Sequence, residues 1–149
     1  MKDLDEITGA IVDSALKIHR DLGPGLLESV YEALLARALQ DLGLRVERQK
    51  TFRFEYGGIV FKEGFRTDLF VEGEVIVELK SVETLPRVHQ KKLLTQLRLS
   101  DKRVGLLINF GEATLKQGLH RVVNRFPSSL SSRLRVNQFS KEALGSPDE

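Results

Sequence analysis

The sequence predicts an α/β sandwich in which helices flank a central mixed β-sheet. Two helical patterns open the chain, alternating and continuous apolar segments follow, and a further helical pattern separates the last apolar segment from the others. With 149 residues, 41% of them apolar and 30% charged, the chain has the composition of one ordinary globular domain. Such a chain buries roughly two-thirds of its unfolded surface, which is enough to form a sandwich core.

Two amphipathic helices are expected at the N-terminal end. Apolar residues recur at helical spacing over residues 4–20, which predicts the first helix. The residues DLGPG at 21–25 break this pattern, because Gly and Pro both disfavour helix. A second helix is predicted over residues 26–41. The stripe expected to face the core consists of Val30, Leu34, Ala38 and Leu42.

Strands are expected to fill the middle of the chain. Loose alternation of apolar residues over 45–56 predicts a strand, and Gly57-Gly58 indicates a hairpin that returns from Ile59. Two further strands are predicted over residues 65–71 and 74–80. Together these segments form an antiparallel meander.

The remaining part of the chain predicts one more crossover and a tail. A basic helix is expected over residues 87–99, and the continuous apolar run 103–110 is typical of a strand covered on both faces. A last helical stretch is expected over 115–126. We therefore predict a domain over residues 1–126 and a loose, Ser-rich tail over 127–149.

Several classes of protein are excluded by composition. No apolar run approaches the roughly 20 residues that cross a bilayer, so no membrane partner is expected. The acidic N-terminal residues MKDLDE are unlike a signal peptide, and we expect a cytoplasmic protein. Without cysteine and with three histidines, the chain excludes thiolate metal sites and a cysteine nucleophile. Any metal site should therefore use carboxylate oxygens.

Two carboxylates are expected to meet on adjacent strands. Alternate residues of a strand share a face, so pairing Leu69 with Val77 keeps the apolar side chains on the core side. The same register sets Asp68 opposite Glu78, with Cβ atoms roughly 5 Å apart. Lys80 lies on the same face as Glu78.

Like charges that face each other destabilise a hairpin, so a positive group is expected between them. The candidates are Lys80, Arg66 opposite it, or a bound cation. Oxygen ligands fit Mg²⁺ or Mn²⁺, which polarises phosphate oxygens and acidifies water. The alternative is an exposed hairpin face that simply carries charged side chains, which is common on soluble proteins.

A third carboxylate is expected from the second helix. Glu28 and Tyr31 are three residues apart, so they project from one side of that helix. Glu28 would reach the same ion, or it would only interact with the helix dipole, which contributes about 0.5 kcal/mol. Tyr31 is expected to pack or form hydrogen bonds beside Glu28.

Four motifs together resemble a known family. The segments GLLESVY at 25–31, GFRTD at 64–68, VELK at 77–80 and VGLLINFG at 104–111 are similar to the GxxExxY proteins of the PD-(D/E)xK nuclease superfamily. The resemblance covers roughly residues 5–125 in the same order. It implies a restriction-endonuclease-like core, a central mixed β-sheet flanked by helices, and Mg²⁺-dependent cleavage of phosphodiester bonds, with DNA as the expected substrate.

The resemblance also implies roles for individual residues. Glu28, Asp68, Glu78 and Lys80 would form the catalytic set, with Lys80 as the signature lysine. Mg²⁺ (or Mn²⁺) would bind Asp68, Glu78 and the backbone carbonyl of Leu79, with help from Glu28. Because some superfamily members keep the fold without the chemistry, a catalytically silent binding or assembly module is the alternative. A third possibility is a small-molecule hydrolase that uses the same carboxylates, but the sequence contains no pocket motif dedicated to such a substrate.

The helix after Lys80 departs from the family pattern. Related nucleases often carry a Gln and a Tyr four residues apart there, whereas this chain has Lys92 and Gln96, with His89 one turn before. Lys92 can hold a phosphate as a point charge, although it cannot accept a hydrogen bond as Gln would. His89 would act as a general base or pack as a partly buried histidine.

Charge is distributed unevenly along the chain. The net charge is +2, yet residues 85–126 hold nine Lys and Arg against two acids, which suits a polyanion partner. A nucleic acid, DNA in particular, is therefore expected. The residues expected to contact phosphates are Arg66, Arg87, Lys91 and Lys92. No specificity module is evident, so a homodimer or a protein partner would supply target choice.

Overall fold

The computed structural model describes residues 2–125, so the predicted tail lies outside the described residues. In this part of the chain, no helix is long and apolar enough to cross a lipid bilayer. The elements in chain order are α1 (Leu4–Leu22), α2 (Glu28–Asp41), β1 (Val46–Tyr56), β2 (Ile59–Val71), β3 (Val75–Lys80), α3 (Val88–Ser100), β4 (Val104–Asn109), α4 (Leu115–Gly118) and β5 (Leu119–Val123).

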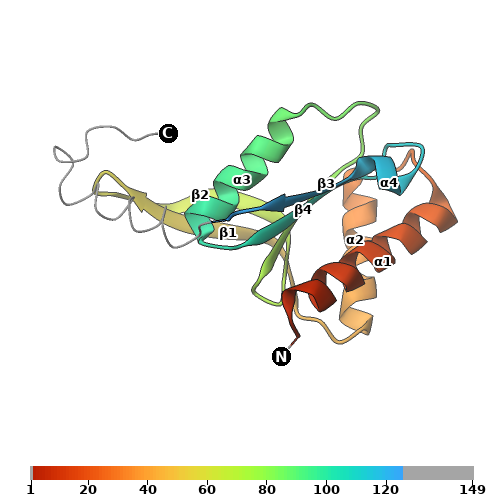
Figure 1. Cartoon of the computed structure of the whole chain (residues 1–149), viewed down its shortest axis with the longest axis horizontal. Coiled ribbons are helices and arrows are strands. Elements are labelled where there is room, and N and C mark those ends of the chain that lie inside the picture. Colours follow the sequence, from red (N-terminus) through yellow and green to blue (C-terminus); the bar gives the residue numbers. More distant parts are fainter. Residues whose placement is uncertain (1, 126–149) are drawn as a thin grey trace.

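The strands form one mixed sheet in the order β1-β2-β3-β4-β5. Only β3 and β4 are parallel to each other, and the other neighbouring pairs are antiparallel. Parallel neighbours require a crossover, and α3 supplies it. Helix α3 covers one face of the sheet, and α1 and α2 cover the other (Figure 1). The predicted α/β class with a flanked mixed sheet is thereby confirmed.

The core has two layers, one on each face of the sheet. The larger layer packs α1 and α2 against the sheet through residues that include Ile11, Leu35, Val77 and Ile108. The smaller layer lies under α3 and consists of Phe70, Ile76, Leu93, Leu97 and Leu107. Because Glu78 alternates with Val77, it lies on the α3 face of the sheet.

The predicted inward stripe of α2 is wrong. Val30 and Leu34 are exposed in the structure. The buried residues of this helix are Tyr31, Glu32, Leu35, Ala36 and Leu39. Tyr31 accounts for this rotation, because its ring stacks on Phe110 with the ring centroids 4.3 Å apart.

The predicted helix over 115–126 is also wrong. Helix α4 ends at Gly118, and the chain continues as β5, antiparallel to β4. A Cβ atom at Gly118 would lie 2.2 Å from the carbonyl oxygen of Asn109, so this close approach requires glycine. Beyond it, Leu119 packs into the larger core layer and Val122 into the smaller one, which is the alternation of a strand.

Asn109 fixes the segment that follows β3. Its Oδ1 accepts hydrogen bonds from the backbone N–H groups of Val82 and Gly111, each at 3.0 Å. Its Nδ2 donates to the carbonyl oxygen of Val82 at 2.9 Å, and Asn109 is fully buried.

We expect Asn109→Ala to lower the free energy of unfolding by about 3 kcal/mol, because it removes three partly buried hydrogen bonds to the backbone of Val82 and Gly111. Urea denaturation followed by circular dichroism measures this loss. Asn109→Asp keeps the two accepting contacts and should lose less. An unchanged midpoint in Asn109→Ala would contradict this role.

Candidate active site

The β2–β3 hairpin brings the two predicted carboxylates together. Its register pairs Leu69 with Val77 and Val71 with Val75, as predicted. Glu72 and Gly73 form the turn with positive φ at both residues, the conformation that matches the twist of a tight hairpin. Continued by one residue, the register sets Asp68 opposite Glu78, on the face that α3 covers.

Asp68 is held at the point where the β2–β3 ladder ends. Its Oδ2 accepts a hydrogen bond from the backbone N–H of Leu79 at 2.8 Å, in place of a carbonyl of β2. The N–H and C=O of one strand residue point to the same side, so the carbonyl of Leu79 also faces Asp68. The next carbonyl, that of Lys80, points to β4 and accepts from Phe110 at 2.8 Å.

Glu78 is the most perturbed acid among the described residues. Its Oε2 is buried, and no hydrogen-bond partner for it is present in residues 2–125. Burial raises the pKa of Glu78 from 4.5 to about 9; the charge of Asp68 adds to the increase and Lys80 opposes it. Without a cation, the pair Asp68 and Glu78 therefore retains a proton at neutral pH.

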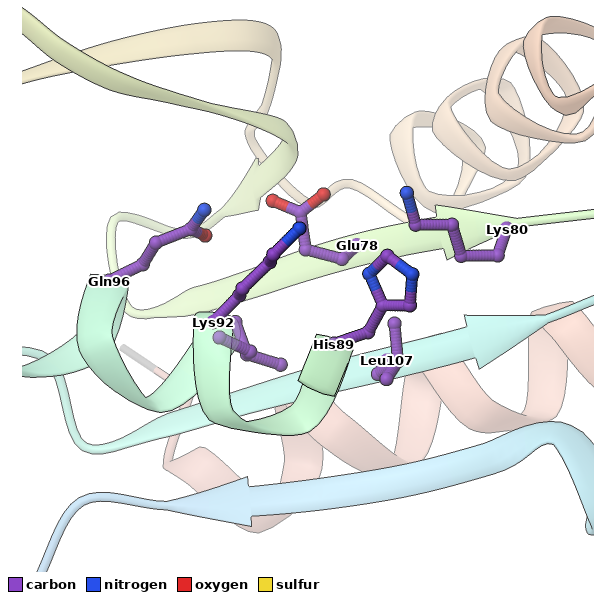
Figure 2. A pocket seen from close by; sticks show the side chains of 7 residues that line it. Glu78, Lys80, His89, Lys92, Gln96 and Leu107 are labelled. Carbon is purple, nitrogen blue, oxygen red and sulfur yellow. The ribbon is translucent and has the colours of Figure 1, made fainter. Parts of the chain in front are cut away.

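A cavity of about 120 Å³ opens between α3 and the sheet. Figure 2 shows Glu78, Lys92 and Gln96 pointing toward one another, with Lys80 on the same side of the sheet. The lining residues are Glu78, Lys80, His89, Lys92, Leu93, Gln96 and Leu107. His89, Lys92 and Gln96, the residues of α3 that the sequence singles out, therefore line the same cavity as Glu78. The Oε1 atom of Gln96 is buried and, within residues 2–125, has no hydrogen-bond partner.

The surroundings of His89 favour its uncharged form. Its pKa lies below the ordinary 6.5, first because the ring is partly desolvated and then because Lys80 and Lys92 carry positive charge nearby. In Figure 2 the imidazole lies between these two lysine side chains. A neutral imidazole can accept a proton in a cavity that otherwise presents positive groups.

Tyr31 packs against Phe110 and forms hydrogen bonds with the loop before α2. Its hydroxyl donates to the carbonyl oxygen of Gly23 at 2.5 Å and accepts from the N–H of Leu26 at 3.3 Å. Ser81, which follows Lys80, donates to the carbonyl oxygen of Leu26 at 2.6 Å. These bonds fix the loop before α2 against the end of β3, and this loop leads directly to Glu28.

The expectation that three carboxylates converge is not met. Within residues 2–125, no three His, Cys, Asp or Glu side chains form a group that could hold a metal ion. Glu28 is exposed, and its charge makes the smallest contribution to the raised pKa of Glu78. The close pair is therefore Asp68 and Glu78, and Glu28 lies farther out.

The predicted phosphate-contacting residues divide into two groups. Lys92 lines the cavity beside Glu78. Arg66, Arg87 and Lys91 are exposed and lie outside the cavity lining. The β2–β3 ladder ends at Leu69, so Arg66 is not paired opposite Lys80 as expected. Arg66 instead pairs with Thr51 of β1.

Two polar residues near Asp68 were not predicted from the sequence. Glu32 on α2 is 7% exposed and pairs with Arg48, whose Nε lies 3.1 Å from Glu32 Oε2. Gln49 donates from Nε2 to Glu32 at 2.8 Å and to Asp68 at 3.3 Å. The available signal was a carboxylate four residues after Glu28, at a spacing that places both on one side of the helix.

A mixed sheet that presents an aspartate, a glutamate and a lysine from adjacent strands is the arrangement expected of the PD-(D/E)xK fold. A family model described as PD-(D/E)XK nuclease superfamily matches residues 5–122. The chain therefore belongs to the PD-(D/E)XK nuclease superfamily and has its restriction-endonuclease-like fold.

No curated protein matches the chain. Among solved structures, one described as the crystal structure of SSO0001 is similar, with a TM-score of 0.40 and 17% sequence identity. The similarity covers 91% of this chain and 87% of the other.

The raised pKa of Glu78 predicts that stability depends on pH. In the metal-free protein, the folded state keeps a proton that the unfolded state releases above about pH 4.5. The free energy of unfolding should therefore fall as pH rises from about 5 to about 9, by at most about 1.4 kcal/mol per pH unit. Glu78→Gln removes this contribution and should be more stable than the wild type at about pH 8.

Urea denaturation in EDTA at several pH values measures the effect. Glu83→Gln, which alters an exposed carboxyl three residues after Lys80, the last residue of β3, is the matched control and should keep the wild-type decline. Parallel pH profiles for the wild type and Glu78→Gln would rule out this account.

Proposed function

We propose that the chain is a GxxExxY-type nuclease that hydrolyses phosphodiester bonds, in DNA, with Mg²⁺ (or Mn²⁺) as cofactor. The observation that carries this proposal is the pair Asp68 and Glu78, with a buried Glu78 oxygen that lacks a hydrogen-bond partner among residues 2–125. Lys80 follows on the same face of β3 and lines the same cavity as Glu78. Two carboxylates in contact call for a cation, and Mg²⁺ is commonly bound by one or two carboxylates together with the phosphates of a substrate.

The donor set fits a hard divalent cation. The carboxylates of Asp68 and Glu78 and the carbonyl of Leu79 are all oxygen donors, and such donors suit Mg²⁺ and Mn²⁺. These three groups would hold the ion, and Glu28 would assist through water. When bound, the ion supplies positive charge that polarises a phosphate oxygen and makes water more acidic. A cation would also let Glu78 give up its proton.

The lysines of the cavity act on the phosphate and on water. Lys80 would orient the attacking water and stabilise the negative charge that develops on the phosphate. Lys92 would hold a non-bridging phosphate oxygen as a point charge, and Gln96 would donate from its amide. His89, whose pKa lies below its ordinary value, would accept a proton in the same cavity. Arg66, Arg87 and Lys91 would contact phosphates along the rest of the strand, which makes binding sensitive to salt.

One observation favours a catalytically silent module as the second candidate. Among residues 2–125, no third His, Cys, Asp or Glu joins Asp68 and Glu78. Thermal melts with Mg²⁺ and with Mn²⁺ separate the two candidates. A working site should gain about 2.7 kcal/mol at a hundredfold excess over the dissociation constant. No shift with either ion would favour the silent module.

Single substitutions at the site should abolish cleavage without unfolding the protein. We expect Asp68→Ala and Lys80→Ala to lose Mg²⁺-dependent cleavage of DNA, because each removes a group that acts directly on the ion or the phosphate. Gel assays on single- and double-stranded DNA and on RNA measure the activity and the substrate class. Lys17→Ala is the control, because that side chain is 71% exposed on α1 and should leave activity unchanged. Equal cleavage by the wild type and both site variants would reveal a contaminant and refute the proposal.

A further inference from the structure

Two consecutive residues of β1 contact the same buried carboxylate. The Nε atom of Arg48 lies 3.1 Å from Glu32 Oε2, and Gln49 donates from Nε2 to Glu32 Oε1 at 2.8 Å. In a regular strand, successive side chains point to opposite faces, so one carboxylate could not receive both. The backbone must therefore depart from strand geometry between them.

That departure lies at Gln49. Its φ is +52°, in the left-handed region that residues other than glycine rarely adopt. The β1–β2 ladder pairs Arg48 with Leu69 and Lys50 with Thr67, and it omits Gln49. In register, the omitted position lies opposite Asp68.

The location of this strained residue is unusual. Within residues 2–125, the other non-glycine residues with positive φ are Glu72, in a hairpin turn, and Asp101, at the end of α3. Turns and helix ends commonly use this conformation. Gln49 adopts it inside a strand, and backbone strain of this kind is a pointer to function when the surrounding contacts maintain it.

The contacts of Gln49 indicate what the strain accomplishes. Its amide group carries two hydrogens, and they are directed at Glu32 and at Asp68 Oδ1, at 2.8 and 3.3 Å. A flipped amide would direct its oxygen at two carboxylates, so Glu32 determines the orientation. Leu79 N–H donates to the other oxygen of Asp68 at 2.8 Å. Both oxygens of Asp68 are thus held, from two neighbouring strands.

We propose that Gln49 is a positioning residue that orients the Asp68 carboxylate toward the cation, and that Glu32 anchors Gln49 for this purpose. The inference rests on the proposed metal site. Each carboxylate oxygen that accepts one hydrogen bond still has a lone pair available for an ion. Hydrogen bonds to ligating carboxylates typically change metal affinity by 10- to 100-fold.

Mn²⁺ binding to the full chain, measured by isothermal titration calorimetry, tests this role together with melting temperatures in EDTA. Gln49→Gly accepts φ near +52° without strain but removes the amide. It should stay folded in EDTA, because the relieved strain offsets the lost hydrogen bond to Glu32, and it should bind Mn²⁺ about 10- to 100-fold more weakly. Gln49→Asn also tolerates this conformation, and its shorter side chain cannot reach both carboxylates. It should show the same loss of affinity, and it decides the matter if Gln49→Gly fails to fold.

The matched control is Asp101→Gly, which relieves the same left-handed conformation (φ +58°) at the exposed end of α3. It should bind Mn²⁺ like the wild type. Wild-type affinity in a folded Gln49 variant, or equal weakening in Asp101→Gly, would overturn the inference and leave the metal site standing. Absence of Mn²⁺ binding to the wild type would overturn the proposed metal site and this inference with it.

Discussion

Two carboxylates in contact, one of them removed from water, form the constraint on which this molecule depends. Asp68 and Glu78 lie on adjacent antiparallel strands, and burial with mutual repulsion raises the pKa of Glu78 to about 9. The neighbouring groups compensate for this charge. The N–H of Leu79 and the amide of Gln49 donate to Asp68, and Lys80 offsets the negative charge at Glu78. Without a cation the carboxylate pair retains a proton, and a bound cation would replace it.

The fold supplies this arrangement by controlling where ladders end. The β2–β3 ladder stops at Leu69, so Asp68 is free to accept from the backbone of β3. On its other edge β3 pairs in parallel with β4, and this pairing requires the α3 crossover that covers Glu78. Asn109 fixes the segment that follows β3. Tyr31 fixes the loop before α2, which lies against the end of β3. The site is therefore a consequence of sheet order as much as of the acidic residues themselves.

The hairpin could be predicted from sequence because the two-residue period of a strand leaves one register that buries the apolar residues, and that register joins Asp68 to Glu78. The rotation of α2 could not be predicted, because two different sets of its residues have helical spacing. The contact of Tyr31 with Phe110, which is distant in sequence, determines which set is buried. β5 was missed because a short segment becomes a strand only by pairing with β4. The left-handed backbone at Gln49 depends on Glu32, far away in sequence.

The most direct measurement is a crystal structure of the protein soaked in Mn²⁺, with the ion located by its anomalous scattering. We expect one peak in contact with carboxylate oxygens of both Asp68 and Glu78, at about 2.1 Å, the distance typical of Mg²⁺–oxygen ligands. The carbonyl of Leu79 should complete the protein ligands. A fully soaked crystal without a peak between these two side chains, or with the ion bound to other residues, would show that Asp68 and Glu78 do not form a metal site.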